Sequence, residues 1–125
     1  MSMRRGLSCL GLLLLAACSS GSEDVIAAWK KAGHTPGEFK DVGEKLPGGK
    51  CVAGRVAGLD ATVCDFSEAE QARKAEDAGW ELVGSAVGSA IVSGKVLLVV
   101  ADSRKEDPSG RRINDVIRTF QQTTH

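Results

Sequence analysis

Two cysteines in the middle of the chain, Cys51 and Cys64, have the side chains with the most reactive chemistry in the sequence. Such a pair can act as a redox couple or form a structural disulfide. Catalytic dithiols usually have two residues between them and lie at a helix N-terminus, where the dipole lowers the thiol pKa. Here twelve residues intervene, and both cysteines lie in segments with the pattern of strands. We therefore predict a structural bridge, with a thiol-disulfide oxidoreductase as the less favoured alternative.

A basic segment near the C-terminus is a second candidate site. Its four cationic residues surround the expected start of a helix: Arg104, Lys105, Arg111 and Arg112. The free amides and the dipole at a helix N-terminus favour anions. The segment therefore predicts an alternative function, the binding of a small anionic ligand such as a phosphate or a lipid headgroup. Acidic residues at positions 102, 106 and 107 neutralise much of the charge, so a solvated loop is the competing interpretation.

The other titratable residues show no catalytic or metal-binding pattern. His34 is the one histidine away from the C-terminus, and we expect it in an exposed loop. Nucleophilic catalysis needs a serine or cysteine with an oriented base, and zinc needs three or four ligands at usable spacings. Paired carboxylates such as Glu68 and Glu70 fall on a helix surface, where they are ordinarily solvated. We predict a protein that is not an enzyme and uses no cofactor and no metal.

The N-terminus has the pattern of a secretion signal. Arg4 and Arg5 precede an apolar run, Leu7 to Ala17, that is rich in leucine. A run of about eleven residues is too short to cross a bilayer, which takes roughly twenty residues in a helix. A charged start, a short apolar core and small residues at the end are typical of a signal peptide that is removed. The end of the run, Leu15-Ala16-Ala17-Cys18, resembles the lipobox of bacterial lipoproteins.

This resemblance implies that Cys18 is lipidated and becomes the first residue of the mature chain. In that family the thiol receives a diacylglyceryl group, and the new amino group is acylated, for example with palmitate. Two or more acyl chains hold a protein firmly on a membrane, since each buried methylene contributes roughly 0.8 kcal/mol. Ser19 stands where an aspartate would signal inner-membrane retention, which favours the outer membrane. We expect an anchored protein that faces the periplasm.

Composition limits what the mature part can do. Residues 1–17 are the expected signal peptide, residues 18–22 a lipidated tether and residues 23–125 a single domain. The mature chain carries 14 basic and 16 acidic residues. It therefore lacks the clustered positive charge that nucleic-acid binding demands. Cys9 leaves with the signal and Cys18 carries lipid, so Cys51 and Cys64 remain to pair in an oxidising compartment.

The segments around these cysteines predict a β-hairpin. Residues 51–56 and 59–66 have strand character and flank a turn at Ala57-Gly58. Pairing residue 56 with residue 59 places Cys51 opposite Cys64, close enough for a disulfide. The predicted hairpin and the predicted bridge therefore support each other.

Apolar spacing and turn residues predict the remaining elements. They are a helix from Glu23 capped by Ser22 and ended by Gly33, a short helix over 39–46, a helix opened by a capping box at 67–70 and ended by Gly79, a hairpin of 86–92 with 95–101 around Ser93-Gly94, and a last helix capped by Ser109. The order is α(α)-ββ-α-ββ-α. It indicates an α+β domain with an antiparallel sheet of about four strands and helices packed on it.

The segment from the first hairpin through the valine-rich strand at 96–100 resembles small envelope lipoproteins of unknown function, which implies no activity. The favoured function is a lipid-anchored, non-catalytic interaction or structural module. Its expected partners are the membrane, through the lipid, and another envelope protein, with no nucleic acid.

Overall fold

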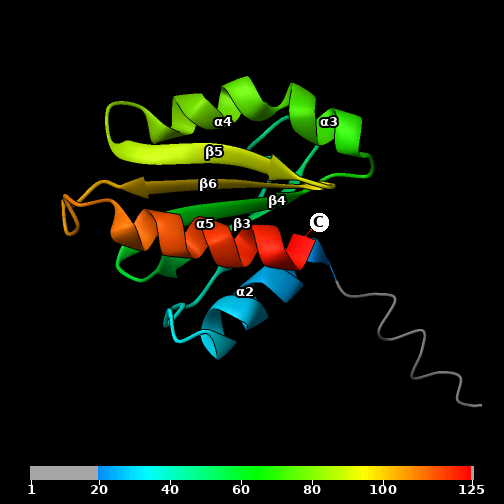
Figure 1. Ribbon diagram of the computed structural model, residues 1–125. Coiled ribbons are helices and arrows are strands. Elements are labelled where there is room, and N and C mark those ends of the chain that lie inside the picture. Colours follow the sequence, from blue (N-terminus) through cyan, green and yellow to red (C-terminus); the bar gives the residue numbers. More distant parts are fainter. Residues whose placement is uncertain (1–19, 125) are drawn as a thin grey trace, which may run out of the picture.

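The computed structural model describes residues 20–124, which form an α+β domain. Its elements in chain order are α2 (Gly21–Lys31), β2 (Lys40–Gly43), β3 (Lys50–Val56), β4 (Leu59–Asp65), α3 (Ala69–Lys74), α4 (Glu76–Val83), β5 (Val87–Ser93), β6 (Val96–Asp102) and α5 (Arg111–Thr124) (Figure 1). The strands form one antiparallel sheet in the order β2-β3-β4-β6-β5. The predicted fold class is confirmed, with one more strand than expected. No helix within residues 20–124 has the length and apolar character needed to span a bilayer.

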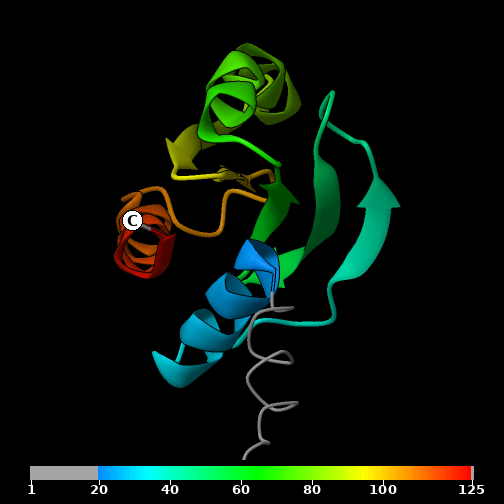
Figure 2. The same cartoon turned by 90° about the vertical axis from the view of Figure 1, so that its right-hand side faces the viewer.

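The sheet has helices on both faces, which creates two hydrophobic cores. Figure 2 shows α2 and α5 on one side and α3 and α4 on the other. The first core packs Trp29 and Phe120 of the helices against strand residues such as Leu59. The second core contains both bridged cysteines and Leu97. Strand β6 lies between β4 and β5 and is buried at every position, as the apolar run 96–100 predicts for most of its length.

The first hairpin has the predicted register. Val56 pairs with Leu59, and Cys51 lies opposite Cys64 with their Cα atoms 4.0 Å apart. The turn residues Ala57 and Gly58 both have positive φ, 54° and 80°. Two positive φ angles give the turn a twist that matches the strands it joins, which fixes the pairing register. The predicted Cys51–Cys64 disulfide is present.

The helix predicted over residues 39–46 is wrong, because this segment contains the edge strand β2. Lys40 pairs with Ala53 of β3, and the register shifts between Asp41 and Gly43. The apolar residues of the segment do not share a face. The Phe39 ring lies 5.9 Å from that of Trp29 in the first core, whereas Leu46 is buried in the second. Three apolar residues at helical spacing are too few to separate a helix from a strand and a turn.

Helix α2 starts two residues before the predicted start. Ser20, and not Ser22, is the cap: its Oγ accepts from the Glu23 amide at 3.1 Å, and Glu23 Oε1 accepts from the Ser20 amide at 3.3 Å. The Ser22 amide donates instead to Asp65 at 3.1 Å. Residues 20–22, expected in the tether, therefore belong to the folded domain. The predicted stop is confirmed, since Gly33 has φ 87° just past the helix end.

The capping box predicted at 67–70 is absent. Ser67 Oγ donates to the Gln71 side chain, and the N-cap residue of α3, Glu68, makes no side-chain cap. Gly79, predicted to end this helix, lies inside α4 where the helix meets the sheet. A Cβ there would lie 3.1 Å from Ala90 Cβ, so glycine permits the close approach. Trp80, the next residue of α4, is 45% exposed.

The second hairpin is present, but its turn lies one residue later than predicted. Ser93 pairs with Val96, so the turn is Gly94-Lys95 and not Ser93-Gly94. Gly94 has φ 61°. Type II′ turns place glycine at the first central position, and this preference decides the register.

Candidate functional site

The Cys51–Cys64 disulfide lies in the second core, away from solvent. The two cysteines are 1% and 0% exposed and belong to a cluster with Leu46 and Phe66. Thiol–disulfide exchange requires a thiolate to reach one of the sulfur atoms. The surrounding side chains block that approach. The burial therefore supports a structural role and gives no support to the oxidoreductase alternative.

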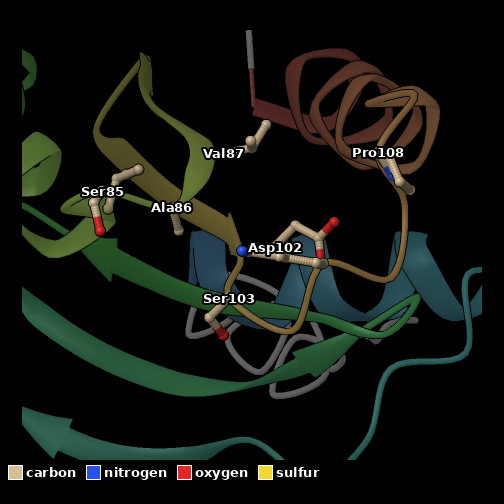
Figure 3. A pocket seen from close by; sticks show the side chains of 8 residues that line it. Ser85, Ala86, Val87, Asp102, Ser103 and Pro108 are labelled. Carbon is tan, nitrogen blue, oxygen red and sulfur yellow. The ribbon is translucent and has the colours of Figure 1, made fainter.

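A pocket of about 650 Å³ opens beside the end of β6 and the start of β5 (Figure 3). Its lining comes from two separate segments: Val83, Ser85, Ala86, Val87, Asp102, Ser103, Lys105 and Pro108. Small-molecule sites commonly combine a mostly apolar wall with a few polar groups. Here the polar groups are the two serines, a lysine and a carboxylate. Sequence reasoning missed this pocket because its two segments meet only when β5 pairs with β6.

Asp102 is a buried carboxylate with a structural task. It is 4% exposed, and its two oxygens accept from the amides of Glu106 and Asp107 at 2.8 and 2.9 Å. Its main-chain oxygen also accepts from the Lys105 amide at 3.2 Å. These bonds hold the 103–107 loop, which carries Lys105 to the pocket. Because each carboxylate oxygen accepts an amide hydrogen bond from this loop, the geometry gives Asp102 a positioning role.

The start of α5 is capped by Asp107. Its Oδ2 accepts from the Arg112 amide at 2.7 Å, while Ser109 Oγ donates to Oδ1 at 2.5 Å and accepts from the Arg111 amide at 3.2 Å. The predicted cap Ser109 takes part, but an aspartate two residues earlier supplies the charge. The protein's own carboxylate thus occupies the helix N-terminus where an anion was expected. The Ser109 hydroxyl, followed by the Arg112 amide, holds the pKa of Asp107 below its ordinary value of 3.8.

This lowered pKa predicts a pH dependence of stability. A carboxyl with a lower pKa in the folded state stabilises the fold at pH values above its unfolded pKa. That contribution disappears as the pH falls through the folded pKa. We expect Asp107→Asn to lower the free energy of unfolding at pH 7 and to change it much less at pH 2. Urea unfolding at several pH values measures this difference, with Asp115→Asn, within the helix that Asp107 caps, as the control. Equal losses for Asp107→Asn at both pH values would contradict the prediction.

The structure separates the four cationic residues of the predicted anion site. Of the four, Lys105 alone lines the 650 Å³ pocket. Arg112 turns toward the β3–β4 turn, where its Nη1 lies 3.6 Å from Glu106 Oε1 and donates to the Ala57 oxygen at 3.3 Å. Arg104 and Arg111 are exposed. Anion binding by these residues stays a prediction, and their arrangement adds no support to it.

A polar network that sequence reasoning missed joins the β3–β4 turn to the loop after β6. Arg55 Nη2 donates to the Gly58 oxygen at 2.7 Å and lies 3.6 Å from Glu106 Oε2, while its Nη1 lies 4.0 Å from Asp60. Ser103 Oγ donates to Asp60. Such half-exposed ion pairs contribute about 0–1 kcal/mol each, so their role is to fix the loop. One part was readable from the sequence, since the predicted hairpin register places Arg55 opposite Asp60.

His34 is half-buried and not in an exposed position as predicted. Its Nε2 lies 3.1 Å from Thr119 Oγ1, which links the end of α2 to α5. Glu70, one of the paired carboxylates, lies 3.8 Å from Lys74 on the surface of α3. Within residues 20–124 no three side chains of histidine, cysteine, aspartate or glutamate gather in a way that could hold a metal ion.

Comparison with family models, with curated proteins and with solved structures found no match to the chain. Cys18, the expected lipidation site, lies outside the described residues, and so does the predicted signal peptide. Arguments for a function therefore rest on the sequence motif at Cys18 and on the surface of the folded domain.

Proposed function

We propose that this chain is a lipoprotein of the bacterial cell envelope whose folded domain is a non-catalytic interaction or structural module. Acyl chains on Cys18 hold it on a membrane, and the domain faces the periplasm. The absence of aspartate at position 19 favours the outer membrane. Its partner is another component of the envelope.

The observation that carries the proposal is the motif Leu15-Ala16-Ala17-Cys18 directly before a folded domain. The capping residue of α2, Ser20, comes only two positions after the proposed lipidation site. One residue of extended chain spans at most about 3.6 Å. The anchor is therefore joined to the domain by a link too short to reach far from the membrane. The Ser22–Asp65 hydrogen bond ties the start of α2 to the sheet, which fixes this link to the body of the domain.

The surface of the domain supports an interaction role. Within residues 20–124, four large apolar side chains are exposed: Val42, Trp80, Leu82 and Val87. Tryptophan is enriched among the residues that dominate binding energies at protein interfaces. An exposed tryptophan on an ordered helix therefore supports a docking surface better than it supports a solvated one.

Lipidation is tested on the full-length chain expressed in a bacterial host. We expect the wild-type protein to incorporate labelled palmitate and to yield a mature N-terminus at Cys18 whose mass includes the acyl groups. Cys18→Ala removes the thiol that receives the lipid, so labelling should be lost. Cys9→Ala is the matched control, because Cys9 lies within the expected signal peptide and should not affect labelling. An unacylated mature chain, or full labelling of Cys18→Ala, would refute the anchor.

Anion binding by the segment Arg104–Arg112 remains the alternative proposal. Lys105 at the edge of the 650 Å³ pocket is the observation in its favour. The carboxylates of Glu106 and Asp107 compete for the nearby cation and helix amides, so the interaction module has the stronger support.

A further inference from the structure

The two edges of the sheet differ in how well they are protected against pairing with another strand. Edge strands are commonly blocked by charged residues, irregular register or short length. Strand β2 has all three: it is four residues long, contains Lys40 and Asp41, and has a register shift between Asp41 and Gly43. Strand β5 has none of them. It is seven residues long, pairs regularly with β6 at each position, and contains no charged residue and no proline.

The open side of β5 presents a regular row of backbone groups. In a hairpin with a two-residue turn, the residues that flank the turn form a hydrogen-bonded pair, and such pairs then alternate along the strands. Ser93 and Val96 flank the turn, so Ser89 and Ile91 also bond to β6. The N–H and C=O groups of Gly88, Ala90 and Val92 therefore point away from the sheet. An added antiparallel strand forms its hydrogen bonds with such groups.

On the α4 side, an exposed aromatic residue borders this edge. Ala75 and Ala78 line a small pocket with Pro47 and Gly48, so that side of the helices faces the β2–β3 loop. Leu82 lies one turn after Ala78 and shares this side. Trp80 lies two positions from both Ala78 and Leu82, and residues two positions apart on a helix differ in direction by about 200°. Trp80 therefore projects to the opposite side of α4, toward β5. Trp80 is 45% exposed, so its ring lies beside the open edge, one turn after the half-buried Glu76.

On the α5 side, the border of the edge is mostly uncharged and its one cation is paired. Thr119 contacts His34 and Arg112 contacts the β3–β4 turn, so this side of α5 faces away from β5. The other side carries Asn114, Ile117, Arg118 and Gln121 at helical spacing, and Arg118 Nη1 lies 3.4 Å from Asp115 Oδ1 on the same helix. Figure 2 shows the edge of β5 between α4 and α5. The strand itself therefore carries no formal charge, and the one cation of its α5 flank is paired within α5.

From this surface we infer that the chain pairs with a second copy of itself, β5 against β5, in an antiparallel arrangement. A two-fold interface brings each patch onto its own copy, so any charge near the axis meets a like charge. The uncharged β5 strand meets this requirement for self-complementarity. Pairing centred on Ala90 aligns all seven residues, with Val87 opposite Ser93 of the second copy. The product is a continuous ten-stranded sheet whose two outer edges are the protected β2 strands.

Self-association is tested with two full-length copies that carry different C-terminal tags, co-expressed and extracted in mild detergent. Capture of one tag should recover the other. Val92→Pro removes an outward amide, and Trp80→Glu replaces the exposed ring by a charge. Each should reduce recovery at least about tenfold, the factor that corresponds to a 1.4 kcal/mol loss of binding. Each variant has a matched control: Val92→Thr keeps the amide, and Leu82→Glu changes the opposite side of α4. Recovery of both controls should stay near the wild-type level.

Two further readouts keep the result interpretable. Formation of the Cys51–Cys64 disulfide, seen on a non-reducing gel, shows that each variant folds. Hydrogen exchange should show slow exchange of the outward amides of Gly88, Ala90 and Val92 in the concentrated wild-type protein and fast exchange after dilution. The inference is overturned if the wild-type copies do not associate, if the folded edge variants associate as well as the controls do, or if β5 binds a different protein in place of a second copy. None of these outcomes depends on whether Cys18 is lipidated.

Discussion

Replacing Trp29 by alanine is expected to lower the free energy of unfolding by about 3–5 kcal/mol, the usual range for removal of a large buried aromatic side chain. Trp29 is 0% exposed and lies between α5 and the sheet in the first core. Its Nε1 donates to the Val116 oxygen at 3.0 Å, and its ring packs against Phe39. The substitution therefore removes packing from two sides and one buried hydrogen bond.

Chemical denaturation monitored by far-UV circular dichroism measures this loss. Trp80→Ala is the matched control, because Trp80 is the other tryptophan of the chain and is 45% exposed. Its effect on the unfolding free energy of dilute protein should stay within about 0.5 kcal/mol, as for most surface substitutions. Similar losses for the two variants would show that Trp29 is not the centre of the first core.

Removing the disulfide with the double substitution Cys51→Ala and Cys64→Ala is expected to cost about 3 kcal/mol on the chain-entropy model for a loop of this length. The bridge joins two residues 13 positions apart and restricts the unfolded chain more than the folded one. Alanine keeps the second core apolar and introduces no buried hydroxyl. For a domain of about 100 residues, this loss lowers the melting temperature by roughly 12–24 °C.

Calorimetry of the oxidised wild type, the reduced wild type and the double variant separates the contributions. The reduced protein and the double variant should both melt well below the oxidised protein. If the double variant melts within about 3 °C of the oxidised wild type, the bridge adds less than about 1 kcal/mol and the prediction is wrong.

The elements that could be predicted from sequence are those fixed by neighbouring residues. Ala57-Gly58 sets its own turn geometry, so the register of the first hairpin and the Cys51–Cys64 pair follow from it. The amphipathic stripe of α5 and the apolar run of β6 each specify an element over many residues. These parts of the α+β fold were confirmed.

The elements that were predicted wrongly depend on distant contacts or on choices between adjacent residues. Strand β2 exists because β3 offers an open edge to it, and its own sequence has a misleading helical spacing. Ser20 competes with Ser22 for the cap of α2, and Asp65, 43 positions away from Ser22, decides between them. The second turn moved by one residue because Gly94 takes the position that needs positive φ.

The candidate site was the least predictable part. The pocket combines residues 83–87 with residues 102–108, and these segments meet only through the strand order β4-β6-β5. The sequence places the basic residues near a helix start, but it does not show that Asp107 caps that helix. The helix amide and the Ser109 hydroxyl that Asp107 binds were not visible in the spacing.

The position of α2 determines how a pair of these domains would sit on a bilayer. Figure 2 shows α2 on one face of the sheet of a single domain. A two-fold axis between antiparallel strands runs perpendicular to their shared sheet, so it would leave both α2 helices of a pair on the same side of that sheet. The starting residue of each helix, two positions from the proposed acyl group, then faces the same leaflet. A dimer built through β5 would lie flat on the lipid with two anchors beneath it and with α3 and α4 directed outward. Four or more acyl chains would hold this platform, which makes escape of one subunit far slower than for a single anchored domain.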